Sequence, residues 1–331
     1  MTGPQMQASG VVPEDQELAE VSVLVSNWGT PELTVRCVNA LLADGVPPER
    51  VVIVDNGSQD DSPAVLSREL PACRLIELEE NIGFPRAINV AARALPGRHY
   101  LIMNNDAFVH RPGSVELLLA AMRDPGVGIV APRLLNEDLT LQRTVRPLDY
   151  PSAVLVRATG LSRFLPNRWQ PRFSNYWDHA ETRAVMCVDG PVLLVRGSLW
   201  DELGGFNEHT LMHGDDTDLC WEARERGLAV WFEADAEFIH LGDASAGRHW
   251  ATPERSRLIG FAEGAIFRRH LPGVRGHLTL AATVFALGSR ALVFRATGSR
   301  DRAVVHRERL LGYIDGFRSS SAGRRDRAGG S

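Results

Sequence analysis

The sequence predicts an α/β protein built on a mostly parallel, Rossmann-like sheet with helices on both faces. Two observations predict this class. Short runs of β-branched and aliphatic residues alternate with amphipathic segments through residue 135, and the runs are almost continuously apolar. Continuous apolar strands are typical of a parallel sheet, because helices cover both of its sides. With 331 residues, the chain is long enough for one large α/β domain with an appendage.

Five predicted strands alternate with four predicted helices in the first part of the chain. The expected strands span 21–27, 50–58, 73–80, 100–106 and 128–135. Three expected helices begin at Pro31, Ser62 and Phe84, and Ser114 is expected to cap a fourth that runs to about Met122. Pro and Ser are favoured where a helix begins, and a turn at 81–83 precedes the third helix.

The second part of the chain is less regular. Residues 145–183 are rich in Arg, Pro and aromatic residues and predict a long, loop-rich insertion. Further expected elements are a strand at 188–197, a helix from Ser198, a helix from Asp215 or Asp216 to Gly227, a strand–turn–strand unit at 230–242, a helix from Thr252 and one or two amphipathic helices within 278–317. The polar residues of 318–331 predict a disordered tail.

Composition and charge exclude several classes of protein. The 36 basic and 41 acidic residues give a net charge of −5, and a net-acidic chain binds nucleic acid poorly. We therefore expect no nucleic-acid partner. The four cysteines are too few and too scattered for a disulfide scaffold. The first 20 residues lack the regions of a signal peptide, so the expected location is the cytoplasm.

Polar side chains follow several of the predicted strands, where α/β proteins bind their ligands. Asn27 ends the first strand, Asp55 and Asn56 end the second, and the segment NNDA (104–107) follows the fourth. Oxygen ligands in such a segment suit Mg²⁺ or Mn²⁺. Asp55 and Asn56 have the groups to bond a base or a ribose. Each segment is also compatible with an ordinary polar turn.

Three carboxylates crowd the start of one predicted helix, in HGDDTDLCWEARERG (213–227). A single Asp suffices to cap a helix, so Asp215, Asp216 and Asp218 leave more than capping to explain. A carboxylate held at a cleft can act as a general base toward an acceptor hydroxyl. His240 follows an apolar strand, a position that by itself is also compatible with a purely structural role.

Taken in chain order, six segments resemble the family 2 glycosyltransferases of GT-A fold, most closely their bacterial rhamnosyltransferase-like branch. These segments are VSVLVSNWGTPEL, VVIVDNGSQDDS, ENIGFPRAINVAARAL, NNDAFV, DGPVLLVRGSLWDELGGFNE and HGDDTDLCWEARERG. The resemblance implies a GT-A catalytic domain followed by C-terminal helices. The expected parts are a loose segment 1–20, a catalytic domain 21–250 with a donor half of about 21–135 and an acceptor half of about 136–250, a helical extension 251–317 and the tail 318–331.

The resemblance also implies an inverting mechanism with one general base, one divalent cation and no protein nucleophile. Asp106 stands in the metal motif, and His240 stands where several such enzymes add a ligand. The implied ion is Mg²⁺ or Mn²⁺. Asp216 aligns with the family's base, but Asp215 replaces the usual Glu before it, so the choice between the two stays open. The implied donor-binding residues are Asn27, Asp55, Asn56, Arg86, Asn104, Asn105 and Asp106, with Arg86 near a phosphate.

The implied substrates are a nucleotide-diphosphate sugar and an acceptor hydroxyl. A deoxyhexose such as rhamnose is the expected sugar. The acceptor is a cell-surface polysaccharide, a lipid-linked sugar or a small molecule. Two alternatives are a nucleotidyltransferase that forms nucleotide sugars and a catalytically silent partner protein. The segment SNWGTPEL after the first strand lacks the Gly-rich basic loop that the first alternative needs, and Asp106, Asp216 and His240 count against the second.

The apolar stretch 277–294 lies outside the resemblance. Gly288, Ser289 and Arg290 interrupt it, so a spanning helix is not expected. Together with Arg295 it is compatible with an interfacial helix at the inner face of the membrane. The net negative charge and the lack of a Lys-rich flank favour packing on the catalytic domain, or on a second subunit in a homodimer.

Overall fold

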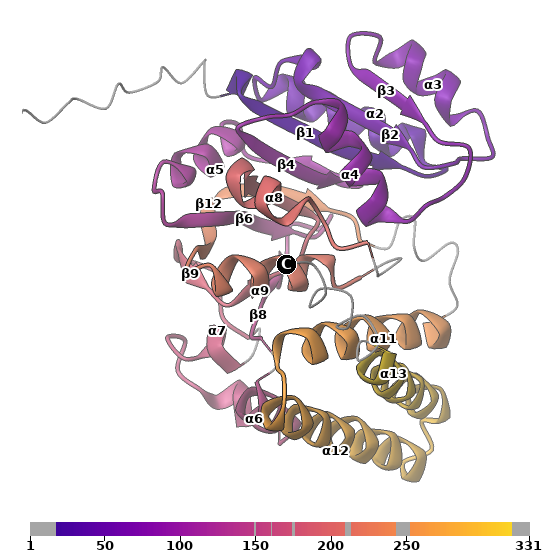
Figure 1. Ribbon diagram of the computed structural model, residues 1–331, viewed down its shortest axis with the longest axis vertical. Helices are drawn as coiled ribbons and strands as arrows, with labels where there is room; N and C mark the ends of the chain where they lie inside the picture. Colours follow the sequence, from indigo (N-terminus) through magenta and orange to yellow (C-terminus); the bar gives the residue numbers. More distant parts are fainter. Residues whose placement is uncertain are drawn as a thin grey trace, which may run out of the picture.

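The computed structural model describes residues 18–148, 150–159, 161–173, 176–208, 213–242 and 252–319. Most of the predicted N-terminal segment 1–20 and of the tail 318–331 lies outside these residues. The described chain forms an α/β part, at the top of Figure 1, and a layer of long helices below it. The α/β class predicted from the sequence is therefore the observed one.

A mixed sheet of ten strands forms the centre of the α/β part. Along the sheet the strands are β3 (Arg74–Glu77), β2 (Val51–Asp55), β1 (Val21–Asn27), β4 (His99–Asn104), β11 (Val192–Arg196), β6 (Val127–Leu135), β12 (Ala229–His240) and β5 (Ala107–Val109), with β7 (Leu141–Gln142) on β6 and β9 (Arg183–Val185) on β12. Strands β1 to β4 are parallel, as predicted. Strand β11 enters antiparallel between β4 and β6. A second small sheet pairs β8 (Val145–Arg146) with β10 (Cys187–Val188).

Helices cover both faces of this sheet, also as predicted. One face carries α2 (Pro31–Ala43), α3 (Ser62–Glu69) and α5 (Ser114–Met122), and the other carries α4 (Phe84–Ala94), α8 (Gly197–Leu203) and α9 (Asp215–Glu225). Strand β1 shows why its sequence is wholly apolar. Val23 and Val25 pack in the core beneath α2, α3 and α5, and Leu24 packs in the core beneath α4, α8 and α9. All three side chains are fully buried. Successive side chains of a strand point to opposite faces, so one apolar run contributes to both cores.

The expectation of a strand–turn–strand unit at 230–242 is wrong. Residues 230–240 belong to the single strand β12, whose register shifts between Glu233 and Glu237 as in a bulge. A bulge accommodates extra residues without ending the strand. Alternation also persists through it, because Ala234 and Ala236 are buried while Asp235 is exposed.

The expectation that Ser114 caps α5 is also wrong. Gly113 is the N-cap residue and Ser114 the first helical residue. The carboxylate of Asp44, which follows α2, accepts hydrogen bonds from the backbone N–H groups of Gly113 (2.5 Å) and Val115 (2.9 Å). An acidic side chain from a neighbouring helix thus satisfies the free donors at this helix start.

The insertion 145–183 contains more regular structure than the sequence predicts. It includes β8, α6 (Pro151–Ala158), the 3-10 helix η2 (Leu161–Phe164), α7 (Gln170–Phe173) and β9. Helix α6 leaves the α/β part and lies beside α12 (Figure 1). The insertion therefore connects the sheet to the C-terminal helices.

Three long helices form the C-terminal layer: α11 (Thr252–His270), α12 (Val274–Ala296) and α13 (Arg300–Ser319). Helices α11 and α13 pack backbone against backbone. A Cβ added at Gly260 would lie 2.1 Å from the carbonyl oxygen of Arg309, and one at Gly312 would lie 2.0 Å from that of Arg257. Only glycine fits such an approach. Ile266 and Phe267 of α11 join the core beneath α9, so this layer is docked on the α/β part.

Candidate active site

The ends of β1 and β2 are tied together by buried polar side chains. The amide of Asn27 donates to Asp55 Oδ1 (2.7 Å), and the hydroxyl of Thr34 donates to Asn27 Oδ1 (2.8 Å). Asp55 also accepts from the backbone N–H (3.1 Å) and the hydroxyl (2.6 Å) of Ser58. Asn27 and Asp55 are almost completely buried. Both predicted donor residues therefore fix the turn after β2, at the edge where α/β proteins bind ligands.

Asn56 and Arg86, two further predicted donor residues, lie at the entrance to α4. Asn56 donates to Asn81 Oδ1 (3.1 Å) and accepts from the N–H of Ile82 (3.0 Å). The guanidinium of Arg86 is half-exposed and lies 3.7 Å from the carboxylate of Glu208. Arg86 is thus accessible to a charged ligand, whereas Asn56 holds the loop that precedes it.

The turn after β4 sends its side chains in different directions. Asn105 is buried, and its amide donates to the hydroxyls of Thr30 (2.8 Å) and Thr34 (2.9 Å), toward the β1–α2 turn. Asp106 instead faces the end of β12, where its Oδ1 lies 3.3 Å from His240 Nε2. These two side chains are only 7% and 12% exposed, so a carboxylate and an imidazole share one nearly buried spot.

Gln142 of β7 fixes the orientation of His240. Its Nε2 donates to Asn136 Oδ1 (3.0 Å) and to the carbonyl oxygen of His240 (3.3 Å). Its Oε1 therefore faces His240 Nδ1 (2.7 Å), which must carry the proton of that hydrogen bond. In the neutral imidazole this leaves the lone pair on Nε2, next to Asp106. Such an outer partner is typical of metal-binding histidines, so the donor set fits a divalent cation.

The predicted base residues lie at the start of α9, against the segment before β11. Asp216 Oδ2 accepts from the N–H of Gly190 (3.0 Å) and from Arg146 (3.3 Å). Its Oδ1 accepts from the N–H of Thr217 (2.6 Å). A Cβ at Gly190 would lie 3.1 Å from Asp216 Cβ, so the glycine permits this close approach.

Burial, modified by the charges around Arg146, shifts the pKa values of the neighbouring carboxyls. Burial, helped by the charge of Asp216, raises the pKa of Asp215 to about 7. Burial raises the pKa of Asp189 to about 6, although its ion pair with Arg146 opposes this. Burial would lower the pKa of Arg146, but Asp189 and Asp216 hold it well above its usual range. A carboxyl that titrates near neutral pH is suited to proton transfer.

The segment 189–191 connects two pairs of side chains: Asp106 with His240, which could hold a metal ion, and Asp215 with Asp216, which could act as a base. The carbonyl oxygen of Pro191 accepts from the N–H of Asn104 (2.8 Å), while Gly190 holds Asp216. His240 also lies close enough to Asp189 for a charge on its ring to act on that carboxylate. The structure therefore brings the ends of β4 and β12 and the start of α9 to one place, as enzymes with metal and base need.

Sequence reasoning missed three residues of this site: Arg146, Gln142 and Asp189. Arg146 and Gln142 lie on the short strands β8 and β7, which have no clear periodicity in the sequence. Asp189 is part of a family-like segment, yet nothing local marks it as a partner of Arg146. The one available sequence signal is that each of these polar or charged residues stands next to a short apolar run.

A second acidic cluster lies on the opposite side of α9, facing α11. Asp218, Glu222 and His270 offer ligand atoms within 4.8 Å of one another. Arg269, however, pairs with both carboxylates, and His270 Nε2 lies 2.7 Å from Asp218 Oδ1. Glu222 also pairs with Arg226 at 2.6 Å. Cationic side chains of the protein already pair with these oxygens, so the cluster is an ion-pair clamp between α9 and α11. It also accounts for the third carboxylate of the helix start.

The clamp predicts a pH-dependent stability. Burial lowers the pKa of His270, but bonds and charges from Asp218 and Glu225 raise it above its usual 6.5. The charged imidazole then stabilises the fold fully below about pH 6.5, and this contribution is lost as the pH rises through the raised value. We expect His270→Gln to cost about 1–3 kcal/mol in acid and less in alkali. Thermal unfolding of both proteins across this range measures the difference, and an equal loss at every pH would contradict it.

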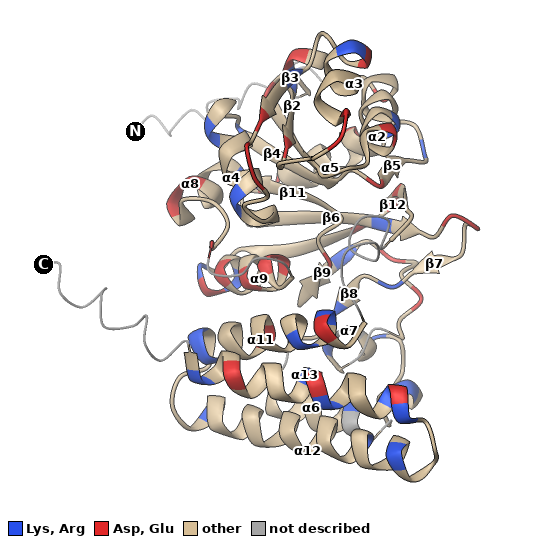
Figure 2. Ribbon diagram, turned by 90° about the vertical axis from the view of Figure 1, so that its right-hand side faces the viewer, with Lys and Arg blue, Asp and Glu red and all other residues tan. Residues whose placement is uncertain are grey.

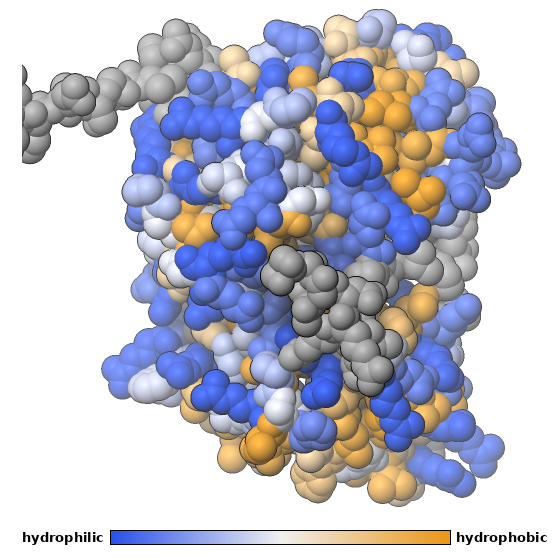
Figure 3. All heavy atoms as spheres, in the orientation of Figure 1, coloured by the Kyte–Doolittle hydropathy of each residue, from blue (hydrophilic) through white to orange (hydrophobic). Residues whose placement is uncertain are grey.

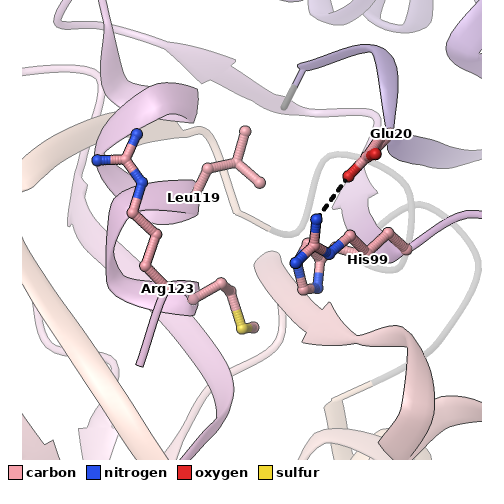
Figure 4. A pocket seen from close by; sticks show the side chains of 6 residues that line it. Glu20, His99, Leu119 and Arg123 are labelled. Atoms are coloured by element: carbon pink, nitrogen blue, oxygen red, sulfur yellow. Dashed lines mark hydrogen bonds and ion pairs between the residues drawn. The ribbon is translucent and has the colours of Figure 1, made fainter. Parts of the chain in front are cut away.

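Two cavities lie away from this site in the described chain. One of about 30 Å³ is lined by Glu20, Arg98, His99, Leu119, Met122 and Arg123 (Figure 4). His99 begins β4 and Asn104 ends it. This cavity therefore lies at the amino ends of the parallel strands, opposite the candidate site at their carboxyl ends. It has room for little more than water. The other, of about 320 Å³, lies along α5 beside Arg111 and Glu116.

Comparisons with known proteins agree with the arrangement. The family model Glycosyl transferase family 2 matches residues 22–189. The chain is 29% identical over 277 residues to the O-antigen biosynthesis protein RfbC of Myxococcus xanthus, a match that covers 80% of this chain but 20% of that protein. It is also 29% identical over 235 residues to an N-acetylglucosaminyl-diphospho-decaprenol L-rhamnosyltransferase of Mycobacterium tuberculosis, which covers 65% of this chain and 75% of the relative.

A solved structure shares the fold. The mannosyltransferase PcManGT from Pyrobaculum calidifontis, in complex with GDP-Man and Mn²⁺, aligns with a TM-score of 0.58 and 18% identity, over 89% of this chain and 87% of that one. At this identity the likeness concerns the fold, which is the GT-A fold that the sequence resemblance implies.

Proposed function

This chain belongs to glycosyl transferase family 2, and from that premise we propose that it transfers a hexose from a nucleotide-diphosphate donor to an acceptor hydroxyl with inversion. The observation that carries the proposal is that residues 189–191 bring together a possible metal-binding pair and a possible base pair. Asp106 lies 3.3 Å from His240, and Asp216 is held 3.0 Å from the N–H of Gly190 beside Asp215. A single displacement needs these two kinds of group and no protein nucleophile.

The residues divide the work between leaving group and acceptor. Asp106 and His240, with Asn104, would hold the divalent cation, and this mixed oxygen and nitrogen set favours Mn²⁺ over Mg²⁺. When bound, the cation would neutralise charge on the donor's phosphates. Asp55 and Asn56 hold the turn after β2, which would face the nucleobase and the ribose of the donor. Arg86 is accessible to a phosphate of the donor. The Asp215–Asp216 pair would take the proton of the acceptor hydroxyl.

The finer identity of the substrates is part of the proposal. A deoxyhexose such as rhamnose is supported by the Mycobacterium tuberculosis relative, whose name is that of a rhamnosyltransferase acting on a decaprenol-linked sugar. A lipid-linked or polysaccharide acceptor is supported by the same name and by that of the O-antigen biosynthesis protein. Both would place the protein in the cytoplasm, at the inner face of the membrane.

A thermal-shift screen tests the proposed donor class. We expect stabilisation by several degrees with one class among UDP-, GDP- and dTDP-sugars, and only when Mn²⁺ is present, because a ligand that binds the folded state raises its stability. Free nucleoside monophosphates serve as the control, since they lack the diphosphate group that the cation would contact. No shift with any nucleotide sugar would contradict the proposal and favour the silent-partner alternative.

A further inference from the structure

Helix α12 exposes a stripe of large apolar side chains along its whole length. Val274, Leu278, Phe285 and Leu292 are 75%, 54%, 64% and 69% exposed. Their spacing of four and seven residues places them on one face of the helix. The stripe runs over the 19 residues from Val274 to Leu292, which is about 27 Å of helix. Figure 3 shows apolar atoms gathered at this lower end of the molecule.

The opposite face of α12 is buried by protein. Ala282 and Ala286 pack with Val154 of α6, and Thr279 and Thr283 are buried as well. α12 is the helix in the described chain that is long and apolar enough to span a membrane, with a mean hydropathy of 1.4, yet 28% of that window is buried. Since α6 and α13 pack along it, its free side suits an orientation in the plane of a surface.

The insertion carries further exposed apolar side chains on the elements beside α12. Leu155 of α6 is 47% exposed, Leu161 and Phe164 of η2 are 61% and 79% exposed, and Trp169 just before α7 is 46% exposed. Both η2 and α7 contact α6, which packs on α12. Exposed aromatic side chains of this kind are typical of the membrane–water boundary. We call α12 together with the described residues of 150–173 the basal face.

The charges of the basal face have one sign. Residues 274–296, 150–159 and 161–173 contain no Asp or Glu, although the chain as a whole carries a net charge of −5. Their arginines include exposed ones at 163, 168, 172, 275 and 295. Figure 2 shows basic positions on α12 and no acidic ones. A surface that is apolar and basic is complementary to anionic lipid.

We propose that the basal face docks in the plane of an anionic lipid bilayer. Self-association is less suited to it, because a two-fold interface would set this surface against its own copy and bring arginines of equal charge together. The proposal does not depend on the sugar or on the reaction. Docking in this way places α6 at the lipid. Helix α6 follows β8, the strand that carries Arg146 of the candidate site.

Vesicle flotation tests the docking. The full chain is mixed with vesicles of phosphatidylcholine plus phosphatidylglycerol, or with phosphatidylcholine alone. We expect binding mainly to the anionic vesicles and release by high salt. The double variant Phe285→Ser/Leu292→Ser should weaken binding roughly tenfold or more, because each buried CH₂ contributes to partition. Arg275→Ala and Arg295→Ala should each weaken it about fivefold.

Matched controls separate docking from unfolding. Leu139→Ser removes a leucine that is 54% exposed on the β6–β7 turn, and Arg93→Ala removes an exposed arginine of α4. Both should bind vesicles as the wild type does. Circular dichroism should show every variant folded. The proposal is overturned if no vesicle binds, or if the apolar variants bind unchanged. It is also overturned if only detergent releases the protein, as for a spanning helix, or if those variants abolish a dimer while vesicles stay unbound.

Discussion

Asp216→Asn is expected to lower kcat by roughly 100-fold or more while donor binding is unchanged, because the substitution removes a proton acceptor and little else. Gly190 donates to Asp216 Oδ2 at 3.0 Å and Thr217 donates to Oδ1 at 2.6 Å, so the single side-chain oxygen of asparagine keeps one of these two hydrogen bonds. Asparagine has nearly the same shape as aspartate, so the start of α9 should keep its fold. Stopped assays of sugar transfer give kcat, and nucleotide titration gives the donor affinity. Asp235→Asn, at the exposed bulge of β12, is the matched control and should behave as the wild type.

The pH dependence of kcat/KM decides between the two aspartates. A general base works when deprotonated, and burial raises the pKa of Asp215 to about 7. Activity should therefore rise with pH through about 7. If Asp215→Asn removes this rise but keeps the alkaline rate, Asp216 is the base and Asp215 modulates it. If Asp215→Asn causes the large loss and Asp216→Asn does not, the base is Asp215.

The parallel half of the fold could be predicted because its signals are local. The strands β1, β2 and β4 are continuous apolar runs, and α2 and α3 begin with proline in their first turn. The antiparallel entry of β11 between β4 and β6 could not be predicted in this way. It depends on pairs such as Val192 with Met103, which are far apart in the chain, and no local pattern encodes a partner.

The candidate site divides along the same line. The polar residues after β1, β2 and β4 could be predicted from position alone, because ligands gather at that edge. Which side chains turn toward each other could not be predicted. Asn105 and Asp106 are adjacent, yet one bonds Thr30 and the other faces His240. Asp218 belongs to the same segment, 213–227, as the candidate base residues, but its side chain forms a hydrogen bond with His270, 52 residues away.

Asp106→Ala is expected to abolish metal-dependent donor binding. Loss of an outer partner of a metal ligand commonly weakens binding by roughly 10–100-fold, so removal of the carboxylate ligand itself should exceed that range. Calorimetric titration of nucleotide sugar, with and without Mn²⁺, gives the affinity without relying on turnover. Asp201→Ala, an exposed aspartate of α8, is the matched control and should bind as the wild type does.

Two outcomes would relocate the cation. If Asp106→Ala and His240→Ala both keep the Mn²⁺ effect, the assignment to the ends of β4 and β12 is wrong. The remaining acidic group in the described chain with suitable spacing is Asp218, Glu222 and His270, and it would then have to lose Arg269, which lies 2.8 Å from Asp218. Arg269→Ala should in that case strengthen Mn²⁺ binding. In the assignment favoured by the structure it should loosen α11 and leave Mn²⁺ binding unchanged, because Arg269 pairs with Asp218 and Glu222, whereas the cation is assigned to Asp106 and His240.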